Sequence, residues 1–308
     1  MRMKRKEDLK KCGICGNLTS RVAFNFKQPH KMYKCRFCES MFLHPLPDAG
    51  TIREFYCEEY FRNHNIQYLK GLDGNSIESR IRLAQESVKY EIHPFKRTGK
   101  LLEVGCASGF FLKAAERLGW ETMGIEISEF ACLFASQRLG LNVMNSRLED
   151  AGLPKNHFDV IVMFMVLEHF PDPVRILQIA KESLKTGGIM IIKIPNYRCV
   201  ESVIFKSKWH QLSFPYHLYI FSPASMKFLA DKLNLSIDAL GTYRHFSNYI
   251  NPVSNHICGR MVKESVNLKE KAGRFKHVLK FLYKSVFSVL DERLLMGEQI
   301  RVVLRKND

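Results

Sequence analysis

The chain has 308 residues, of which 46% are hydrophobic, and its formal net charge is +16 at pH 7. This length and composition are enough for one large folded domain with a real core and a small accessory unit. No apolar run reaches the roughly 18 residues that a membrane-spanning helix needs. The large positive charge indicates an anionic partner, either nucleic acid, an acidic membrane surface or an anionic substrate, or simply a solvated basic surface.

The N-terminus, MRMKRKEDLKK, is basic and is not followed by an apolar stretch, so it does not read as a secretory signal. Nine cysteines in a chain of this length do not indicate a disulfide scaffold. The two CxxC pairs among them indicate a metal site in a reducing compartment. We therefore expect a cytoplasmic protein.

Four cysteines near the N-terminus have the spacing of a zinc site. Cys12 and Cys15 form one CxxC pair, and Cys35 and Cys38 form a second pair after a gap typical of zinc ribbons. Two such turns can offer four thiolates to one tetrahedral ion. A shell of four thiolates has no open position for a substrate, so we expect a structural Zn²⁺ in a ribbon of residues 1–48. The alternatives are reduced CxxC turns without metal and a redox CxxC pair.

Residues 49–98 are predicted to be helical. The stretch TIREFYCEEYFRNH is rich in aromatic residues, and SIESRIRLAQESVKYEI places apolar residues at helical spacing. From residue 99 onward, strand-like and helix-like segments alternate, with strands at KLLEV, ETMGIE, LNVMN, FDVIVMF and GIMIIKI. This alternation predicts an α/β domain with a parallel sheet and helices on both faces. The segments SIDALGTY and EQIRVVLRK add a sixth and a seventh strand.

The stretch KLLEVGCASGFFLKAAERLGWETMGIE predicts a strand, a tight glycine turn, a helix and a second strand that ends in Glu126. In this layout a nucleoside-bearing cofactor lies over the strand ends and Glu126 accepts its ribose hydroxyls. The turn opens with an acid, Glu103, and does not have the glycine spacing of a dinucleotide site. An acid here suits a cofactor that carries an ammonium and a sulfonium and would repel a pyrophosphate.

At these residues the sequence resembles the class I S-adenosylmethionine (SAM) methyltransferases, whose first motif is (D/E)-x-G-x-G-x-G. Here Ala107 replaces the middle glycine, between Gly105 and Gly109. The resemblance runs from about Cys12 to Lys306 and is closest to methyltransferases with an N-terminal zinc ribbon from bacterial polysaccharide and small-molecule biosynthesis. It is carried by YKCRFCESMFLHPLP, LLEVGCASGFFL, MGIEIS, FDVIVMFMVLEHFPDP, LKTGGIMIIKIPN and FPYHLYIFS. Quinone-biosynthesis O-methyltransferases are more distant relatives.

The resemblance implies a seven-stranded, mostly parallel, Rossmann-like sheet in residues 99–308, closed by a late antiparallel hairpin. It also implies that helices of the 49–98 segment lie over the SAM pocket as a lid. We expect Glu103 to hold the cofactor's ammonium and Ile127 to stack on its adenine. The expected cofactor-binding residues are Glu103, Gly105, Ala107, Gly109, Glu126, Ile127, Leu148, Glu149 and Met165. Simple core packing is the alternative for the apolar members of this set.

Methyl transfer also requires a base that removes a proton from the acceptor. His169, in LEHFPDP, follows the fourth strand, and His217, in FPYHLYIFS, lies where the family commonly has a Pro-x-His near the acceptor. Histidine has a pKa that permits proton removal near neutrality, so both are candidate catalytic residues. The alternative for each is a helix-capping or core histidine.

A long insertion, 245–296, separates the last two strands and contains an amphipathic helix candidate at 272–290, with a row of lysines beside an apolar face. Packing on its own domain or on a second copy is one interpretation, and peripheral contact with an anionic membrane is the other.

We interpret the chain as a SAM-dependent methyltransferase that acts on a hydroxyl, or a carbon, of a sugar or other small molecule. The rival functions are a nucleic-acid methyltransferase, which the FMVLEH stretch disfavours because it lacks a base-stacking N-P-P-[YF] motif, and a non-catalytic SAM-binding module.

Overall fold

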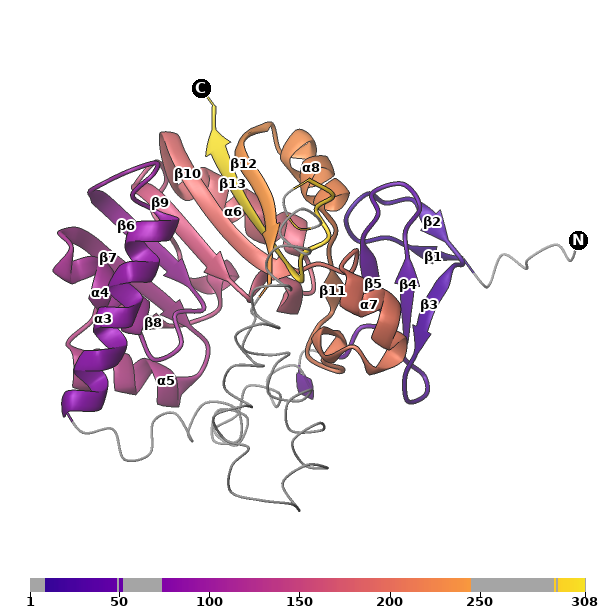
Figure 1. Ribbon diagram of the computed structural model, residues 1–308, viewed down its shortest axis with the longest axis horizontal. Helices are drawn as coiled ribbons and strands as arrows, with labels where there is room; N and C mark the ends of the chain where they lie inside the picture. The colour runs from indigo at the N-terminus through magenta and orange to yellow at the C-terminus, as the bar shows by residue number, and fades with distance from the viewer. Residues whose placement is uncertain (1–8, 49, 52–73, 245–290, 292, 308) are drawn as a thin grey trace, which may run out of the picture.

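A computed structural model of the chain describes residues 9–48, 50–51, 74–244, 291 and 293–307. Most of these residues belong to a seven-stranded sheet flanked by helices, beside a smaller β-rich unit (Figure 1). The strands of the large sheet are β6 (Gly99–Val104), β7 (Trp120–Glu126), β8 (Val143–Asn145), β9 (Phe158–Phe164), β10 (Leu184–Pro195), β12 (Leu235–Tyr243) and β13 (Gln299–Lys306). The helices around it are α3 (Gly74–Glu91), α4 (Phe110–Arg117), α5 (Glu129–Leu133), α6 (Pro173–Ser183), α7 (Val200–Phe205) and α8 (Pro223–Lys232).

The strand order of the large sheet is β12-β13-β10-β9-β6-β7-β8. The four pairs from β10 to β8 are parallel, whereas β13 runs antiparallel to both of its neighbours. The chain order reverses between β6 and β9, so the carboxyl ends of these two strands border the crevice where α/β proteins bind ligands. The expected seven-stranded sheet with a late antiparallel strand is therefore confirmed.

Helices cover both faces of this sheet, so both faces are buried. The side chains along each strand point alternately to one face and to the other, and the two sets contribute to different cores. Leu102, Ile161 and Ile192 face a core with α6 and α8, whereas Leu101 and Val160 face a core with α3 and α4. In Figure 1 the helix α3 crosses the sheet next to α4. The helical prediction for the second half of the 49–98 segment is thus confirmed, while its aromatic first half lies outside the described residues.

The N-terminal unit is held to the large domain by strand pairing. Its strands are β1 (Lys10–Lys11), β2 (Leu18–Thr19), β3 (Val22–Asn25), β4 (Lys31–Lys34) and β5 (Met41–His44). The strand β11 (Tyr219–Ile220) comes from the second half of the chain and pairs with β5, so that one sheet has the order β11-β5-β4-β3. The core on the α6 side continues from the large domain into this unit.

An ionic cluster joins the two residues that flank segment 245–290. Arg244, at the end of β12, is buried and pairs with Asp291 at 2.6 Å and with Glu201 of α7 at 2.5 Å. Its guanidinium also donates to the Met296 carbonyl oxygen. Loss of either acid would leave the buried guanidinium without that charge partner, which is costly. The cluster therefore holds Arg244 and Asp291, the residues on either side of segment 245–290, close together. The amphipathic helix predicted at 272–290 lies outside the described residues.

Candidate functional site

The glycine turn between β6 and α4 has a backbone that ordinary residues rarely adopt. Gly105, Ala107 and Gly109 have φ angles of 70°, 47° and 77°. A Cβ on Gly105 would lie 2.7 Å from Val166 Cγ2, and one on Gly109 would lie 2.6 Å from Leu141 Cδ1. Ala107, in the place of the family's middle glycine, is therefore held in the left-handed region at a cost of about 1–2 kcal/mol.

Glu126, at the end of β7, holds this turn in place. One of its carboxylate oxygens accepts the Ala107 N–H at 2.8 Å, and the other accepts the Ser128 N–H at 2.9 Å. Burial raises the pKa of Glu126, whereas these backbone donors lower it. Each oxygen still has a second lone pair, so the carboxylate can also accept from ligand hydroxyl groups.

Glu103 lies in β6, two residues before Gly105, and is a buried acid with incomplete hydrogen bonding. Burial raises the pKa of Glu103 well above its ordinary value, and the neighbouring charge of Glu126 raises it further. Its Oε2 atom has no hydrogen-bond partner. An unsatisfied buried carboxyl is costly, so a cationic ligand beside it would relieve an existing penalty.

The other predicted cofactor residues lie along the same carboxyl edge of the sheet. The Ile127 side chain, just after β7, is 37% exposed and is therefore available for contact with a flat ring of a ligand. Leu148 is buried in the core, so only its backbone is available to a ligand, and Glu149 pairs with Arg147 at 2.9 Å. Met165 follows β9 with a φ of 55° and donates its N–H to the Lys193 carbonyl oxygen.

The two candidate catalytic histidines are brought together, although they lie 48 positions apart in the sequence. The ring centroids of His169 and His217 are 4.8 Å apart. Burial lowers the pKa of His169 to about 4, against the raising effect of the Tyr216 and Met165 carbonyls. Burial, followed by the nearby His169, lowers the pKa of His217 to about 3. Both rings are therefore neutral at pH 7 and are weak proton acceptors in this state.

Sequence reasoning missed Glu168, which joins these histidines in one cluster. It is fully buried, and neither of its carboxylate oxygens has a hydrogen-bond partner. Burial raises the pKa of Glu168 to about 8. The sequence did contain a signal for Glu168, because this acid directly precedes a histidine shortly after a parallel strand. Residues in that position lie at the edge of the sheet where ligands bind.

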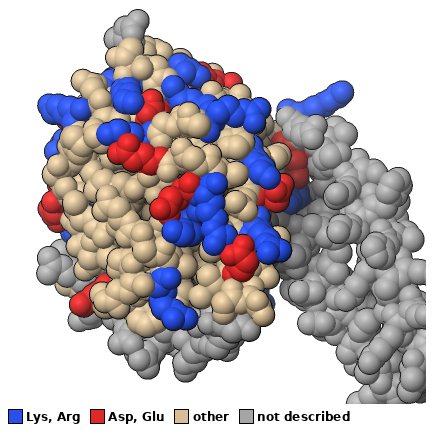
Figure 2. Space-filling model, turned by 90° about the vertical axis from the view of Figure 1, so that its left-hand side faces the viewer, with Lys and Arg blue, Asp and Glu red and all other residues tan. Residues whose placement is uncertain are grey.

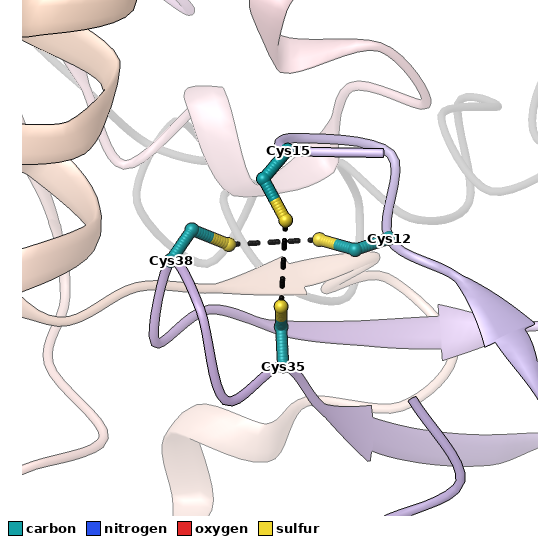
Figure 3. Close-up of side chains that lie close together, drawn as sticks. All are labelled: Cys12, Cys15, Cys35 and Cys38. Atoms are coloured by element: carbon teal, nitrogen blue, oxygen red, sulfur yellow. Dashed lines mark hydrogen bonds between the residues drawn. The ribbon is translucent and has the colours of Figure 1, made fainter. Parts of the chain in front are cut away.

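The four N-terminal cysteines converge on one point (Figure 3). The Cys12 and Cys38 sulfur atoms are 3.6 Å apart, and those of Cys15 and Cys35 are 3.5 Å apart. All four are free thiols. Sulfur atoms around a tetrahedral zinc ion lie roughly 3.8 Å apart, given Zn–S bonds of about 2.3 Å. The chemistry and the spacing of this donor set therefore fit zinc.

Charged side chains of both signs are interspersed on the face of the molecule in Figure 2. Among the residues that the structure describes, several charged side chains form ion pairs at the surface, such as Arg117 with Glu78 and Lys100 with Glu121. This face has no continuous basic stripe of the kind that tracks a nucleic-acid backbone. Across the part of the chain that the structure describes, no helix has the length and apolar character to span a membrane.

Comparison with known proteins places the chain in a family. A family model described as "Methyltransferase domain" matches residues 77–240, which is more than half of the 308 residues. The chain belongs to this methyltransferase domain family. The expected fold is confirmed, because solved SAM-dependent methyltransferase structures share it.

Individual relatives are more distant. A ubiquinone biosynthesis O-methyltransferase from Cereibacter sphaeroides is 32% identical over 102 residues, which cover 32% of this chain and 41% of the relative. The chain thus spans less than half the length of the curated relatives it matches. A SAM-dependent methyltransferase structure from Archaeoglobus fulgidus has 19% identity and a TM-score of 0.50 over 73% of this chain and 94% of that one. Another, from Thermotoga maritima, has 16% identity and a TM-score of 0.52 over 81% and 99%.

The cysteine cluster predicts one zinc ion per chain that depends on all four thiols. The Cys35→Ser variant should lose this zinc and become protease-sensitive within residues 9–48, because the unit is too small to be stable on its own core. Cys199→Ser, which changes a buried cysteine outside the cluster, is the matched control and should keep the metal. Metal analysis and limited proteolysis check both variants. Stoichiometric zinc in Cys35→Ser would refute the ligand set.

The position of Glu126 predicts that Glu126→Ala weakens SAM binding about 10- to 100-fold. The variant loses a hydrogen bond to the ligand from a charged group, worth about 1.5–3 kcal/mol, and it also loses the support of the turn. Glu121→Ala, an exposed position on the same strand, is the control and should bind normally. Isothermal calorimetry gives the affinities, and a thermal melt verifies folding. Equal affinity in both variants would contradict the assignment.

Proposed function

We propose that this chain transfers a methyl group from SAM to a hydroxyl, or a carbon, of a sugar or other small molecule in polysaccharide or secondary-metabolite biosynthesis. The observation that carries the proposal is the Glu126 carboxylate that accepts the Ala107 N–H across the carboxyl ends of β6 and β7, in a chain of the methyltransferase domain family. The O-methyltransferase name of the Cereibacter relative favours a hydroxyl acceptor. The sugar pathway follows from the sequence resemblance alone.

When bound, SAM supplies an electrophilic methyl group on a sulfonium and a neutral thioether as the leaving group. The residues of the chain bind and orient it. We assign the ribose hydroxyls to Glu126 and the ammonium group to Glu103, and the adenine to Ile127 with the backbone of Leu148 and Glu149. Gly105, Ala107 and Gly109 let the backbone approach the methionine end, because side chains are small or absent there. Met165 borders the crevice at the end of β9.

His169 and His217 are proposed to act on the acceptor side. The His169 N–H donates to the carbonyl oxygen of Val166, whose side chain leaves no room for a Cβ on Gly105 of the glycine turn, and the His217 ring lies beside that of His169. An acceptor beside these rings would therefore be near the methyl group. The backbone ties the two segments together, because the Leu218 N–H donates to the Glu168 carbonyl oxygen at 2.9 Å. Orientation of the acceptor within this pair of segments is the minimum role that the geometry supports.

We propose three functional regions in the chain. Residues 1–48 form a zinc ribbon with Cys12, Cys15, Cys35 and Cys38 as ligands to a structural Zn²⁺. Residues 49–98 form a helical linker and lid, and residues 99–308 form the methyltransferase domain with the insertion 245–296. The pairing of β5 with β11 supports a ribbon that stabilises the acceptor side, because His217 lies only two residues before β11.

We also propose peripheral contact with an anionic membrane. The sequence of 272–290 motivated this proposal, and helix α7 supports it. Val203, Ile204 and Phe205 are at least half exposed, and two lysines follow at 206 and 208. Apolar side chains flanked by basic residues are typical of segments that lie on acidic lipid surfaces.

Burial of Glu103 predicts that SAM binding releases a proton. Burial and the nearby Glu126 raise the pKa of Glu103 and so favour its protonated form in the free protein, whereas the ammonium group of SAM favours its ionised form. Affinity should therefore rise with pH below the raised pKa of free Glu103, by up to about tenfold per pH unit, and level off above it. Calorimetry in buffers of different ionisation enthalpy measures the proton, and Glu103→Gln should abolish both effects. Proton uptake, or the same pH slope in Glu103→Gln, would contradict the role.

Transfer itself is tested with isotopically methyl-labelled SAM and a panel of nucleotide sugars, catechols and single-stranded RNA. Label should appear in a small hydroxylated acceptor, with equal formation of S-adenosylhomocysteine, and not in RNA. His217→Ala should lower turnover about 10²–10⁴-fold while SAM affinity stays unchanged. Label in RNA would favour a nucleic-acid methyltransferase. SAM binding without transfer to any acceptor would favour a non-catalytic module.

A further inference from the structure

The N-terminal four-cysteine unit concentrates positive charge that the protein does not neutralise. Residues 1–48 hold 11 of the 47 lysines and arginines but only 4 of the 31 acidic residues, which is a surplus of seven out of the chain's sixteen net positive charges. In the part of the unit that the structure describes, six cations make no ion pair: Lys11, Arg21, Lys27, Lys31, Lys34 and Arg36. Its acid Glu39 pairs instead with Arg198 of the large domain, at 3.0 Å. The unit therefore has the electrostatic character of a surface that binds an anionic partner.

Like charges are close to one another around Lys34. Burial lowers the pKa of Lys34, and the positive charge of Arg21 lowers it further, whereas the charge of Glu39 raises it. The Lys34 ammonium lies 4.5 Å from the centroid of the Tyr197 ring. An anion beside Lys34 and Arg21 would favour the charged form of the lysine and offset this repulsion.

Exposed apolar side chains accompany these cations. Three large apolar residues of the unit are exposed by 57%, 39% and 66%: Leu18, Val22 and Phe37. Each has an unpaired cation as its immediate neighbour, with Lys11 opposite Leu18 in the β1–β2 pair, and Arg21 and Arg36 one residue before the other two. Apolar side chains next to basic ones are typical of segments that lie at the boundary between the headgroups and the acyl chains of acidic lipids.

Helix α7 extends this exposed apolar surface. The Arg198–Glu39 ion pair and the contact of Lys34 with Tyr197 join the unit to the residues directly before α7, which begins at Val200. The helix therefore lies beside the unit (Figure 1). Its exposed apolar side chains are on the same half of the molecule as those of the unit.

We propose that the four-cysteine unit binds the phosphate headgroups of an anionic membrane through Lys11, Arg21 and Arg36, while the neighbouring apolar side chains enter the lipid boundary. This inference rests on the membrane contact of the proposed function and deepens it, because it names the surface that makes the contact. The unit thereby has a role beyond holding a metal ion: it docks the enzyme.

A lipid surface suits these residues better than two other occupants do. A single-stranded nucleic acid binds through aromatic side chains on which its bases stack, whereas Leu18 and Val22 are aliphatic. A second copy of the chain would bring together two units of the same positive charge, which repel each other. An anionic bilayer offers phosphates to the cations and an apolar interior to the exposed side chains.

Docking through this unit would also orient the enzyme. The unit shares a sheet with β11, and His217 lies two residues before that strand. The acceptor side of the site is therefore attached to the element that contacts the membrane. An acceptor located at the lipid surface would lie on the same side of the molecule as the candidate histidines.

Vesicle flotation of the full-length protein tests the surface. We expect binding to vesicles of phosphatidylcholine with phosphatidylglycerol at low salt, release at high salt, and no binding to phosphatidylcholine alone. The triple variant Lys11→Gln, Arg21→Gln, Arg36→Gln should bind the anionic vesicles about 100-fold more weakly, because each cation near such a surface contributes about fivefold. The double variant Leu18→Ser, Phe37→Ser keeps the charge and should weaken binding about tenfold.

The matched control removes the same number of charges from the large domain. Lys89, Lys100 and Arg117 each pair with an acid at the surface. The triple variant Lys89→Gln, Lys100→Gln, Arg117→Gln should therefore bind the anionic vesicles as the wild type does. Circular dichroism verifies folding of every variant, and Arg36→Gln alone, with an expected fivefold loss, replaces the first triple variant if that one does not fold.

Three results would overturn the proposed surface. The first is undiminished vesicle binding in the Lys11, Arg21, Arg36 variant, and the second is an equal loss in this variant and in its control. The third is binding to single-stranded RNA, measured by fluorescence anisotropy, that these three cations control while the vesicles are not bound. A loss confined to Lys276→Gln, Lys280→Gln, Lys284→Gln would assign the membrane contact to the insertion and would also overturn this surface.

The proposed function fails on different evidence. Calorimetry with S-adenosylhomocysteine on the same samples reports cofactor binding independently of the vesicles. No binding of this cofactor product by the wild type would overturn the methyltransferase proposal and leave the lipid surface standing. Absence of the wild type from the anionic vesicles would overturn the membrane contact together with this surface and leave the methyltransferase proposal standing.

Discussion

The bidentate role of the Glu126 carboxylate is the constraint on which the candidate cofactor site depends. One oxygen holds the Ala107 N–H and the other holds the Ser128 N–H, so the ends of β6 and β7 are joined through a single side chain. The turn backbone is strained at Ala107, and strain of this kind persists only where surrounding contacts over-determine it. The hydrogen bond from Ala107 is one such contact, and the close approach of Val166 to Gly105 is another.

Two buried acids with incomplete hydrogen bonding lie at the carboxyl edge of the sheet, beside the candidate cofactor site. Glu103 lies near the end of β6, and Glu168 lies shortly after the end of the adjacent strand β9. Each lacks hydrogen bonds that a buried carboxyl normally makes. These two acids lie where the topology of the sheet creates a crevice. A ligand with an ammonium group at Glu103 would offset the penalty there.

The N-terminal unit is part of the acceptor side because it shares a sheet with β11. The segment from Trp209 to Leu218 lies between α7 and β11, and it provides His217 and the carbonyls that orient both histidine rings. Phe214 of this segment stacks on Phe26 of the small unit, with ring centroids 4.5 Å apart. Loss of the cysteine cluster would therefore disturb the histidines as well as the unit itself.

The sequence by itself determined the local chemistry. Alternation of strands and helices predicted the sheet, the glycine spacing predicted the turn, and CxxC spacing predicted a converging set of thiols, because each of these signals comes from residues that are neighbours along the chain. Only the tertiary structure decided three further features: the strand shared between β5 and β11, the contact of His169 with His217, and the desolvation of Glu168. These depend on segments 48 to about 180 residues apart, and the burial that sets a pKa or leaves a carboxyl unsatisfied is a property of packing that no local pattern contains.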